Sequence, residues 1–478
     1  MQNLNIFAVF LFYCFSVMGQ PQKEVILIDE PGFPFMFELN PNENLVVTRS
    51  YQGKTIKKKI KLIAIHTFSE PNYWFPDTMD QIDYYQFLVD LEVDDKPISL
   101  YHRPYQMPVI FEGLRIYIEN IKQFNESAEY GKSSEMVKEV RISVCMENEP
   151  WGPEYIDFPI NNYVWRSAVY NNTWSSLVPF NKLYYHRGED YGAIPDRLEV
   201  VSPVDGIIRS TPIPDGVNGS NMVSIVASNG LRWDLAHMNI ESIRPEYPVG
   251  TKVGAGTVLG KTGMTWGGKK SQEMDPHLHV GLSMDTISLA SFPYLLEAYM
   301  RKYPDPVIAI AGGYRFATVG QPVELDASRS FSRDGQPIKY RWRLSNGEIS
   351  DLKKATIKYE QPGIFTEELQ IESIEGKKDR DFLYVKVYDP AEKHDFAFGW
   401  AYYYPFRGIQ PGDEVLFWNR LANTMDEVKI NFGDNPEWYT IRKEATHRYN
   451  KPGKYVVTLK SIGQGNEPVT LKMEVTVE

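Results

Sequence analysis

Residues 54–65 read KTIKKKIKLIAI, and the polar and apolar side chains alternate along this run. Three later runs follow the same pattern: QFLVDLEV (86–93), GLRIYIENI (113–121) and VRISVCM (140–146). Period-two alternation brings the apolar side chains to one face of a strand, and the Pro, Asn, Asp and Gly residues between the runs favour turns. We therefore predict antiparallel strands that form a β-sandwich-like domain over residues 20–150.

The lysines between Lys54 and Lys61 give the first of these strands a basic character. One interpretation is a patch that binds a cell wall. The simpler one is a solvated edge strand, in which lysines discourage pairing with a second sheet. We expect the edge strand.

The composition indicates a folded chain of several domains. The 478 residues are 42% hydrophobic and 24% charged, and a chain this long exceeds one typical hydrophobic core. The 34 Gly and 32 Pro residues follow no collagen-like period. The net charge of -11 argues against sequence-independent binding of nucleic acid or of an anionic membrane surface, because both require clustered Lys and Arg.

Residues 1–19, MQNLNIFAVFLFYCFSVMG, form an uncharged apolar segment that predicts a signal peptide cleaved near Gly19. The protein is then exported to the periplasm, the cell surface or the medium. The segment lacks a Lys or Arg before its apolar run, so a retained membrane anchor is the alternative. Cys14 lies inside this segment and Cys145 lies alone in a strand-like run, which leaves no intramolecular disulfide and predicts no disulfide-linked partner. We expect Cys145 to be a buried small hydrophobe.

An internal repeat organises the last third of the chain. The pattern Tyr-x-x-Pro-Gly-x-Phe/Tyr-x-x-x-Leu begins at Tyr359 and again at Tyr449, 90 residues later. This period predicts two tandem β-sandwiches at 303–392 and 393–478. Both modules resemble polycystic-kidney-disease (PKD) domains, the second through the segment NFGDN (431–435). The resemblance implies a role at the cell surface, with a polysaccharide or a protein as the partner.

Residues 151–302 contain four of the eight histidines of the chain, and this clustering indicates that the catalytic site lies in this region. A catalytic zinc site uses three imidazole or carboxylate ligands and keeps a fourth position open, a set that His186, Asp190 and His279 can supply. His277 and His279 are two residues apart, so in a strand they lie on the same face and can serve two different tasks. A helix with Ser291 as its N-cap is predicted to close this domain.

The same region resembles the M23 (LytM or lysostaphin-like) family of zinc metallopeptidases over about 100 residues. The matching segments are HRGEDYGA (186–193), VVSPVDGIIRS (200–210), NMVSIVASNGLRWDLAHM (221–238), PVGTKVGAGTVLGKTGMT (248–265) and PHLHVGLSM (276–284). The resemblance implies a β-rich domain with one Zn²⁺ per chain and hydrolysis of peptide bonds in bacterial peptidoglycan. It also implies that His186, Asp190 and His279 are the zinc ligands. His237 and His277 are then the catalytic histidines.

Three functions are compatible with this pattern. The first is an active peptidoglycan endopeptidase, and the second is a non-hydrolytic protein of the same family that binds the wall or activates another hydrolase. The third is a surface adhesion protein whose β modules dominate. Competent residues at all five key positions favour the enzyme.

Overall fold

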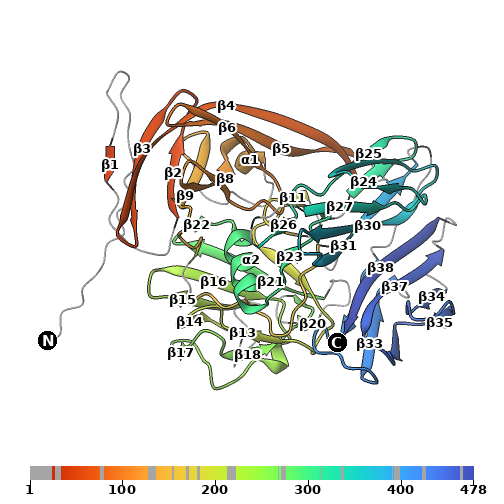
Figure 1. Cartoon of the computed structure of the whole chain (residues 1–478). Helices are drawn as coiled ribbons and strands as arrows, with labels where there is room; N and C mark the ends of the chain where they lie inside the picture. Colours follow the sequence, from red (N-terminus) through yellow and green to blue (C-terminus); the bar gives the residue numbers. More distant parts are fainter. Residues whose placement is uncertain are drawn as a thin grey trace.

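The computed structural model confirms a mainly β, multidomain protein (Figure 1). Among the described residues the helices are α1 (Lys122–Ser127), α2 (Ser291–Lys302) and a 3-10 turn, η1 (Ile240–Ser242). None of these helices combines the length and apolar character needed to cross a bilayer. The structure describes residues 24–26, 34–75, 80–127, 136–152, 155–167, 172–179, 183–212, 222–266, 269–270, 276–313, 315–333, 335, 338–389, 391, 399–421, 427–462 and 467–478. The predicted signal segment lies outside these ranges.

The N-terminal part contains two sheets that share one core. The first has the strand order β1 (Glu24–Ile26), β3 (Asn44–Tyr51), β4 (Lys54–Phe75), β5 (Asp80–Val93) and β6 (Lys96–His102). The second has the order β2 (Phe35–Leu39), β9 (Val140–Met146), β8 (Leu114–Ile121) and β7 (Val109–Phe111). Leu62 and Val89 of the first sheet belong to one apolar cluster with Ile116 and Ile142 of the second. All four alternating runs of the sequence therefore lie in strands that bury one shared core.

The edge-strand expectation is right for most of the basic run, because residues 54–59 pair with β3 alone and only Ile60 and Lys61 also lie beside β5. β4 pairs with β3 from Lys54 to Lys61, and from Ile60 onward it also pairs with β5. Acidic residues of β5 and of the turn after it neutralise the lysines: Lys58 lies 2.8 Å from Asp94 and Lys61 lies 3.7 Å from Glu92. The charge pattern predicted the solvated edge, but it did not predict the ion pairs with Asp94 and Glu92.

A seven-stranded sheet built by the middle part of the chain, called the central sheet below, positions the candidate site. Its order is β12 (Glu189–Gly192), β21 (His277–Met284), β16 (Leu231–Ala236), β15 (Met222–Ala227), β14 (Gly206–Ser210) and β17 (Lys252–Val253), with β22 (Ile287–Ser288) beside β21. Three small pairs surround it: β10 (Leu177–Pro179) with β11 (Leu183–Tyr185), β13 (Glu199–Val201) with β18 (Val258–Lys261), and β19 (Thr265–Trp266) with β20 (Lys269–Lys270). Alternate residues of β16, such as Leu231, Trp233 and Leu235, are fully buried in the core.

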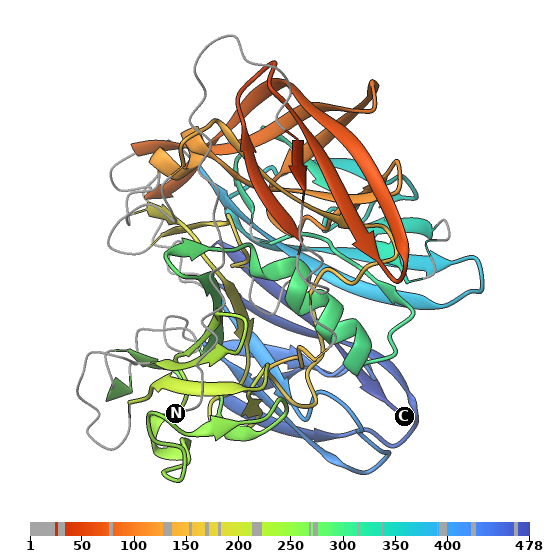
Figure 2. The ribbon, with the colours of Figure 1, turned by 90° about the vertical axis from the view of Figure 1, so that its left-hand side faces the viewer.

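Helix α2 lies between the N-terminal sheets and the central sheet (Figures 1 and 2). Its predicted start is one residue off, because Ala290 is the N-cap and makes no side-chain cap bond. The Ser291 hydroxyl instead donates to the Glu189 carboxylate at 3.2 Å. The helix is tied to distant segments through a hydrogen-bonded ion pair between Arg115 and Glu297. It therefore joins parts of the chain that are far apart in sequence.

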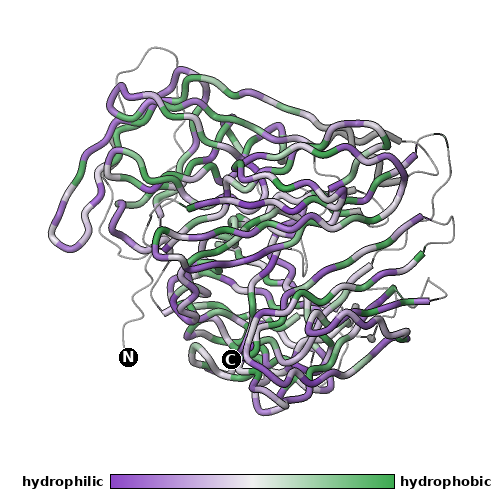
Figure 3. The backbone as a smooth tube through the Cα atoms, turned by 45° about the vertical axis from the view of Figure 1, so that its right-hand side comes forward, coloured by the Kyte–Doolittle hydropathy of each residue, from purple (hydrophilic) through white to green (hydrophobic). Residues whose placement is uncertain are grey.

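The C-terminal modules share one nine-stranded sheet. Its main path is β24 (Arg315–Thr318), β31 (Lys378–Tyr388), β30 (Gly363–Ser373), β38 (Pro468–Val477), β37 (Gly453–Ile462), β34 (Val428–Asn431) and β35 (Tyr439–Ile441), with β27 (Ile338–Arg343) on β30 and β28 (Ile349–Ser350) on β27. The remaining strands form β23 (Val307–Ile308) with β26 (Phe331–Ser332), β25 (Pro322–Asp326) with β29 (Lys354–Lys358), and the sheet β32 (Ala401–Tyr404), β33 (Glu414–Asn419) and β36 (Glu444–Arg448). The two modules join where Ile364 of β30 pairs with Val469 of β38. Figure 3 shows how hydrophilic and hydrophobic residues alternate along the backbone.

The sequence repeat occupies equivalent places in both modules. Gly363 begins β30 and Gly453 begins β37. In front of each strand a tyrosine ring packs on the aromatic ring two residues into the strand, with centroids 5.0 Å apart for Tyr359 and Phe365 and 4.3 Å apart for Tyr449 and Tyr455. The repeat therefore encodes the same turn and ring pair twice.

A largely buried arginine connects the segment before the central sheet to both modules. The Arg166 guanidinium lies 3.1 Å from the Asp379 carboxylate and 3.7 Å from that of Glu474. The next backbone N–H, of Ser167, donates to Asp381 at 3.1 Å. The modules thus pack on the central part through charged and hydrogen-bonded contacts as well as through the apolar core.

Candidate metal centre

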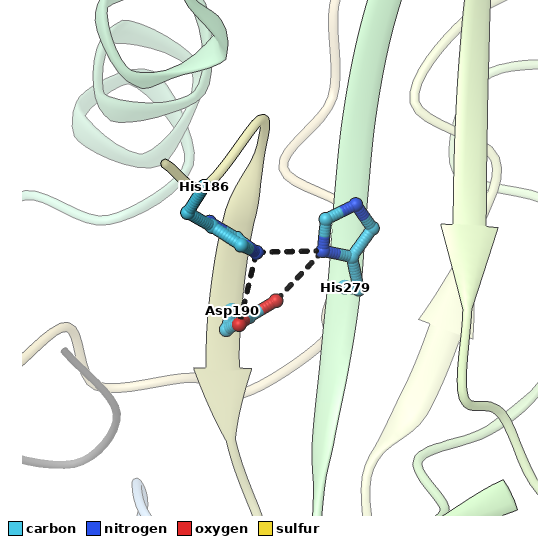
Figure 4. A group of neighbouring side chains, drawn as sticks. All are labelled: His186, Asp190 and His279. Carbon is cyan, nitrogen blue, oxygen red and sulfur yellow. Dashed lines mark hydrogen bonds and ion pairs between the residues drawn. The ribbon is translucent and has the colours of Figure 1, made fainter. Parts of the chain in front are cut away.

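His186, Asp190 and His279 converge on one point beside the central sheet (Figure 4). The Nε2 atom of His186 lies 3.1 Å from Nδ1 of His279 and 3.1 Å from Oδ2 of Asp190. Nδ1 of His279 lies 2.8 Å from Oδ1 of Asp190. Two imidazole nitrogens and a carboxylate therefore face one another.

The register of the sheet explains most of this convergence. Asp190 of β12 is directly opposite His279 of β21, and Ala236 of β16 is opposite His279 on its other side. Opposite residues of antiparallel neighbours project from the same face, with Cβ atoms about 5 Å apart. His277 is two residues before His279, so it also lies on this face. His237 follows Ala236 and completes the group.

His186 enters from the loop before β12, which passes very close to His279. A side-chain carbon on Gly188, whose φ is +143°, would lie 2.7 Å from Cε1 of His279 and 2.7 Å from the carbonyl oxygen of Val280. Only a glycine lets the loop approach β21 this closely. Gly188 is thus part of the geometry of the site.

The N-terminal core holds the residue before His186. Tyr185, the last residue of β11, belongs to the apolar cluster of the two N-terminal sheets. Its ring centroid lies 4.0 Å from that of Phe124, and its hydroxyl accepts a hydrogen bond from the Tyr85 backbone N–H at 3.3 Å. The N-terminal domain therefore fixes the strand that leads into the first candidate ligand.

Two further histidines lie beside the three converging side chains. The ring centroids of His237 and His277 are 4.7 Å apart, and that of His237 is 6.0 Å from that of His279. Nε2 of His277 lies 3.5 Å from Oδ1 of Asp190. The structure therefore brings together all five residues singled out in the sequence.

Burial and neighbouring rings control the charges in this cluster. Burial lowers the pKa of His237, and the nearby rings of His277 and His279 lower it further, so this imidazole is neutral at pH 7. Burial alone would raise the pKa of the Asp190 carboxyl, but His186 and His277 more than offset this and hold it well below its ordinary value. Asp190 is therefore an ionised carboxylate at pH 7.

The donor set fits zinc. Zinc binds imidazole nitrogen and carboxylate oxygen at about 2.0–2.2 Å, and three donors about 3 Å apart can all be reached from one point at that distance. Asp190 is also held from outside, because its backbone N–H donates to the Asn172 carbonyl at 2.9 Å and the Asn172 amide donates to Oδ2 at 3.2 Å. Such outer contacts orient ligands in metal sites.

Several residues of the site were not singled out in the sequence. The Thr265 carbonyl lies 2.9 Å from Nδ1 of His237, and Glu189 is buried behind Asp190, where it accepts from the Trp174 N–H at 3.0 Å. Burial raises the pKa of Glu189 to about 8. Gly188 and Asn172 complete this set. Of these, only Glu189 and Gly188 carry a sequence signal, since they lie between His186 and Asp190.

Comparison with known proteins gives one family match and several distant structural likenesses. No curated protein matches the chain. A structure provisionally assigned as a glycyl-glycine endopeptidase lytM from Ruminococcus gnavus is 22% identical, with 28% of this chain and 63% of that one covered and a TM-score of 0.20. The glucan-locus protein SGBP-B of Bacteroides ovatus, solved with a mixed-linkage heptasaccharide, is 12% identical, with 36% and 47% covered and a TM-score of 0.15. Likenesses at these TM-scores carry no argument here.

The family match concerns the C-terminal part. The model of the PKD domain matches residues 303–387, which agrees with the resemblance predicted for the first module. The predicted resemblance of the second module, and that of residues 151–302 to M23 metallopeptidases, stay predictions. Residues 303–387 are therefore similar to PKD domains.

Proposed function

We propose that this protein is an exported zinc-dependent endopeptidase that hydrolyses peptide bonds of bacterial peptidoglycan. One zinc ion per chain would be held by His186, Asp190 and His279. The observation that carries the proposal is the convergence of these three side chains within 3.1 Å of one another, with two further histidines beside them. The M23 resemblance of the segments that contain all five residues supports the choice of substrate.

Zinc, when bound, supplies a Lewis acid that polarises a peptide carbonyl and makes water a nucleophile at neutral pH. The protein supplies the proton transfers. A histidine that acts as the general base must be neutral and must present an unprotonated ring nitrogen.

His237 meets these requirements. The Thr265 carbonyl 2.9 Å from Nδ1 selects the tautomer that carries its proton there, because a carbonyl oxygen only accepts hydrogen bonds. Nε2 is then the basic nitrogen. The backbone at His237, directly after β16, has a φ of +64°, an uncommon value for a non-glycine residue. We assign His237 as the residue that takes up a proton from water.

His277 has the position of a donor. It is buried, and its Nε2 lies 3.5 Å from the Asp190 carboxylate. A protonated imidazole beside the reacting carbonyl can donate to the developing oxyanion or to the leaving amine. We assign this role to His277.

The test is digestion of purified peptidoglycan by the chain from residue 20, loaded with zinc, with the released fragments identified by mass spectrometry. New amino and carboxyl termini at one type of peptide bond are expected, and the activity should be lost with His279→Ala. Binding to peptidoglycan without any new termini would overturn the endopeptidase and leave the non-hydrolytic binding or activating protein. The proposed export is based on the apolar segment at residues 1–19. The proposed partner of the C-terminal modules, a surface polysaccharide or protein, is based on their resemblance to PKD domains.

A further inference from the structure

The face of the central sheet that carries the candidate ligands continues beyond them. Asp234 of β16 is opposite Gly281 of β21, and Arg232 is opposite Ser283. Across β16 in the other direction, Asp234 is opposite Ser224 of β15. Since directly opposite residues share a face, these side chains lie on the same face as His279. The alternate residues of β16 and β21 point into the core.

Gly281 lies between His279 and Asp234 on this face and has no side chain that could separate them. A side-chain carbon on Gly281 would lie 3.6 Å from Nε2 of His279 and 3.6 Å from Cβ of Asp234. Asp234 is thus the next side chain along the sheet face after His279. A peptide bound at the metal and extended along β16 would meet it first and Arg232 next.

Arg232 is held in place but still faces solvent. Its Nε donates to Oδ1 of Asp234 at 2.9 Å, and Nη2 donates to the Ser224 hydroxyl at 3.1 Å. Ser224 is fully buried and itself donates to Asp234. The Arg232 side chain is nevertheless 46% exposed, and its Nη1 donates to no described residue. The guanidinium is therefore oriented in advance and has donors left for a ligand.

We infer that Arg232, oriented by Asp234 and Ser224, forms a subsite that binds a carboxylate of the peptide substrate. The inference rests on the proposed function and narrows its substrate class to peptides with a free carboxylate near the bond that is cut. A planar guanidinium with a fixed orientation matches the two oxygens of a carboxylate, and such charge-assisted bonds are the stronger ones. Because Asp234 and Ser224 already hold the Arg232 side chain, little side-chain entropy is lost when a ligand binds.

The position of Arg232 sets where the carboxylate must be. Arg232 is four residues from Ala236, the residue opposite His279, which corresponds to about 13 Å along the strand. An extended peptide covers this distance in about four residues. The subsite is therefore expected to bind a carboxylate that lies within about four residues of the scissile bond.

The experiment measures binding and hydrolysis separately on the full zinc-loaded chain. Uncross-linked muropeptides are titrated by calorimetry before and after chemical conversion of their carboxylates to amides. Wild-type protein is expected to bind the carboxylate form about 10- to 100-fold more tightly, Arg232→Ala should abolish this preference, and Arg232→Lys should restore part of it. Arg341→Ala is the matched control, since Arg341 also donates through Nε to an aspartate, at 2.7 Å, but on the distant strand β27.

Equal binding of the two forms, absence of binding, or a preference that survives Arg232→Ala would each overturn the subsite. Cross-linked dimers are then digested in the same two forms. A carboxylate preference that depends on Arg232 without any hydrolysis would overturn the proposed endopeptidase and leave the subsite standing. If both forms are hydrolysed at equal rates, and Arg232→Ala hydrolyses them as fast as the wild type does, the subsite is overturned and the endopeptidase stands.

Discussion

Replacing Gly188 with alanine tests whether the approach of the His186 loop to β21 shapes the metal centre. The added methyl carbon would lie 2.7 Å from Cε1 of His279 and 2.7 Å from the Val280 carbonyl oxygen. Ordinary van der Waals contact for such a carbon begins at 3.4 Å, so the loop and the strand must separate by about 0.7 Å. His186 lies on one side of this contact and His279 on the other.

A separation of this size exceeds what zinc coordination tolerates. Metal–ligand distances vary by only about 0.2 Å, so two ligands moved apart by about 0.7 Å cannot both keep their bonds. Changes that misorient ligands cost about 10- to 100-fold in metal affinity, and we expect Gly188→Ala to reach the upper end of this range. The assay is competition for zinc between the full chain and a chromophoric chelator at pH 7.

Gly230→Ala is the matched control. Gly230 also has a positive φ, +88°, and lies between β15 and β16 of the same sheet, but a side-chain carbon there would have no atom within 4 Å. It should lower the free energy of unfolding by about 1 kcal/mol, because alanine is strained at a positive φ, and leave the zinc affinity unchanged. If Gly188→Ala binds zinc as tightly as the wild type, the pairing of His186 with His279 in one metal site is wrong.

Three further outcomes are expected. His237→Ala should retain about one zinc per chain, measured by metal analysis, while hydrolysis falls by about 10²- to 10⁴-fold; loss of the zinc would make this residue a ligand instead. Arg166→Met leaves the buried Asp379 without its guanidinium and should lower the free energy of unfolding by about 3 kcal/mol in urea titrations, and an unchanged midpoint would show that the ion pair contributes nothing. Burial raises the pKa of Glu119 to about 7, so the folded state holds this proton more tightly than the unfolded state does. The contribution of Glu119 to the free energy of unfolding should therefore fall by about 3 kcal/mol as the pH rises from about 4.5 to 7. Glu119→Gln should flatten that part of the pH–stability curve.

The sequence predicted the strands and the candidate ligands for physical reasons. The apolar residues that β8 and β9 contribute to the N-terminal core, such as Ile116 and Ile142, alternate with polar residues along each strand, and that alternation is visible without knowledge of their partners. The ligands were found because few residue types bind zinc. The spacing of His277 and His279 also fixes a common face in any strand.

Features that depend on how distant segments meet could not be predicted in this way. The length of β5 decides which part of β4 has two neighbouring strands, and the lysine pattern does not show that β5 begins to flank β4 at Ile60. Ser291 has the chemistry of a cap, but its hydroxyl is taken by Glu189, 102 residues earlier in the chain. Gly188 shows its role only once the path of its loop against His279 is known.

The place of Tyr185 in the N-terminal core couples metal affinity to the folding of another domain. In the proposed site, any opening of that core frees the strand before His186, and the chain then loses a ligand without any change in the central sheet. Coupling of this kind is reciprocal, so bound zinc adds about RT ln(1 + [Zn]/Kd) to the free energy needed to open the N-terminal sheets. Zinc concentration then determines how readily a domain that contributes no candidate ligand unfolds.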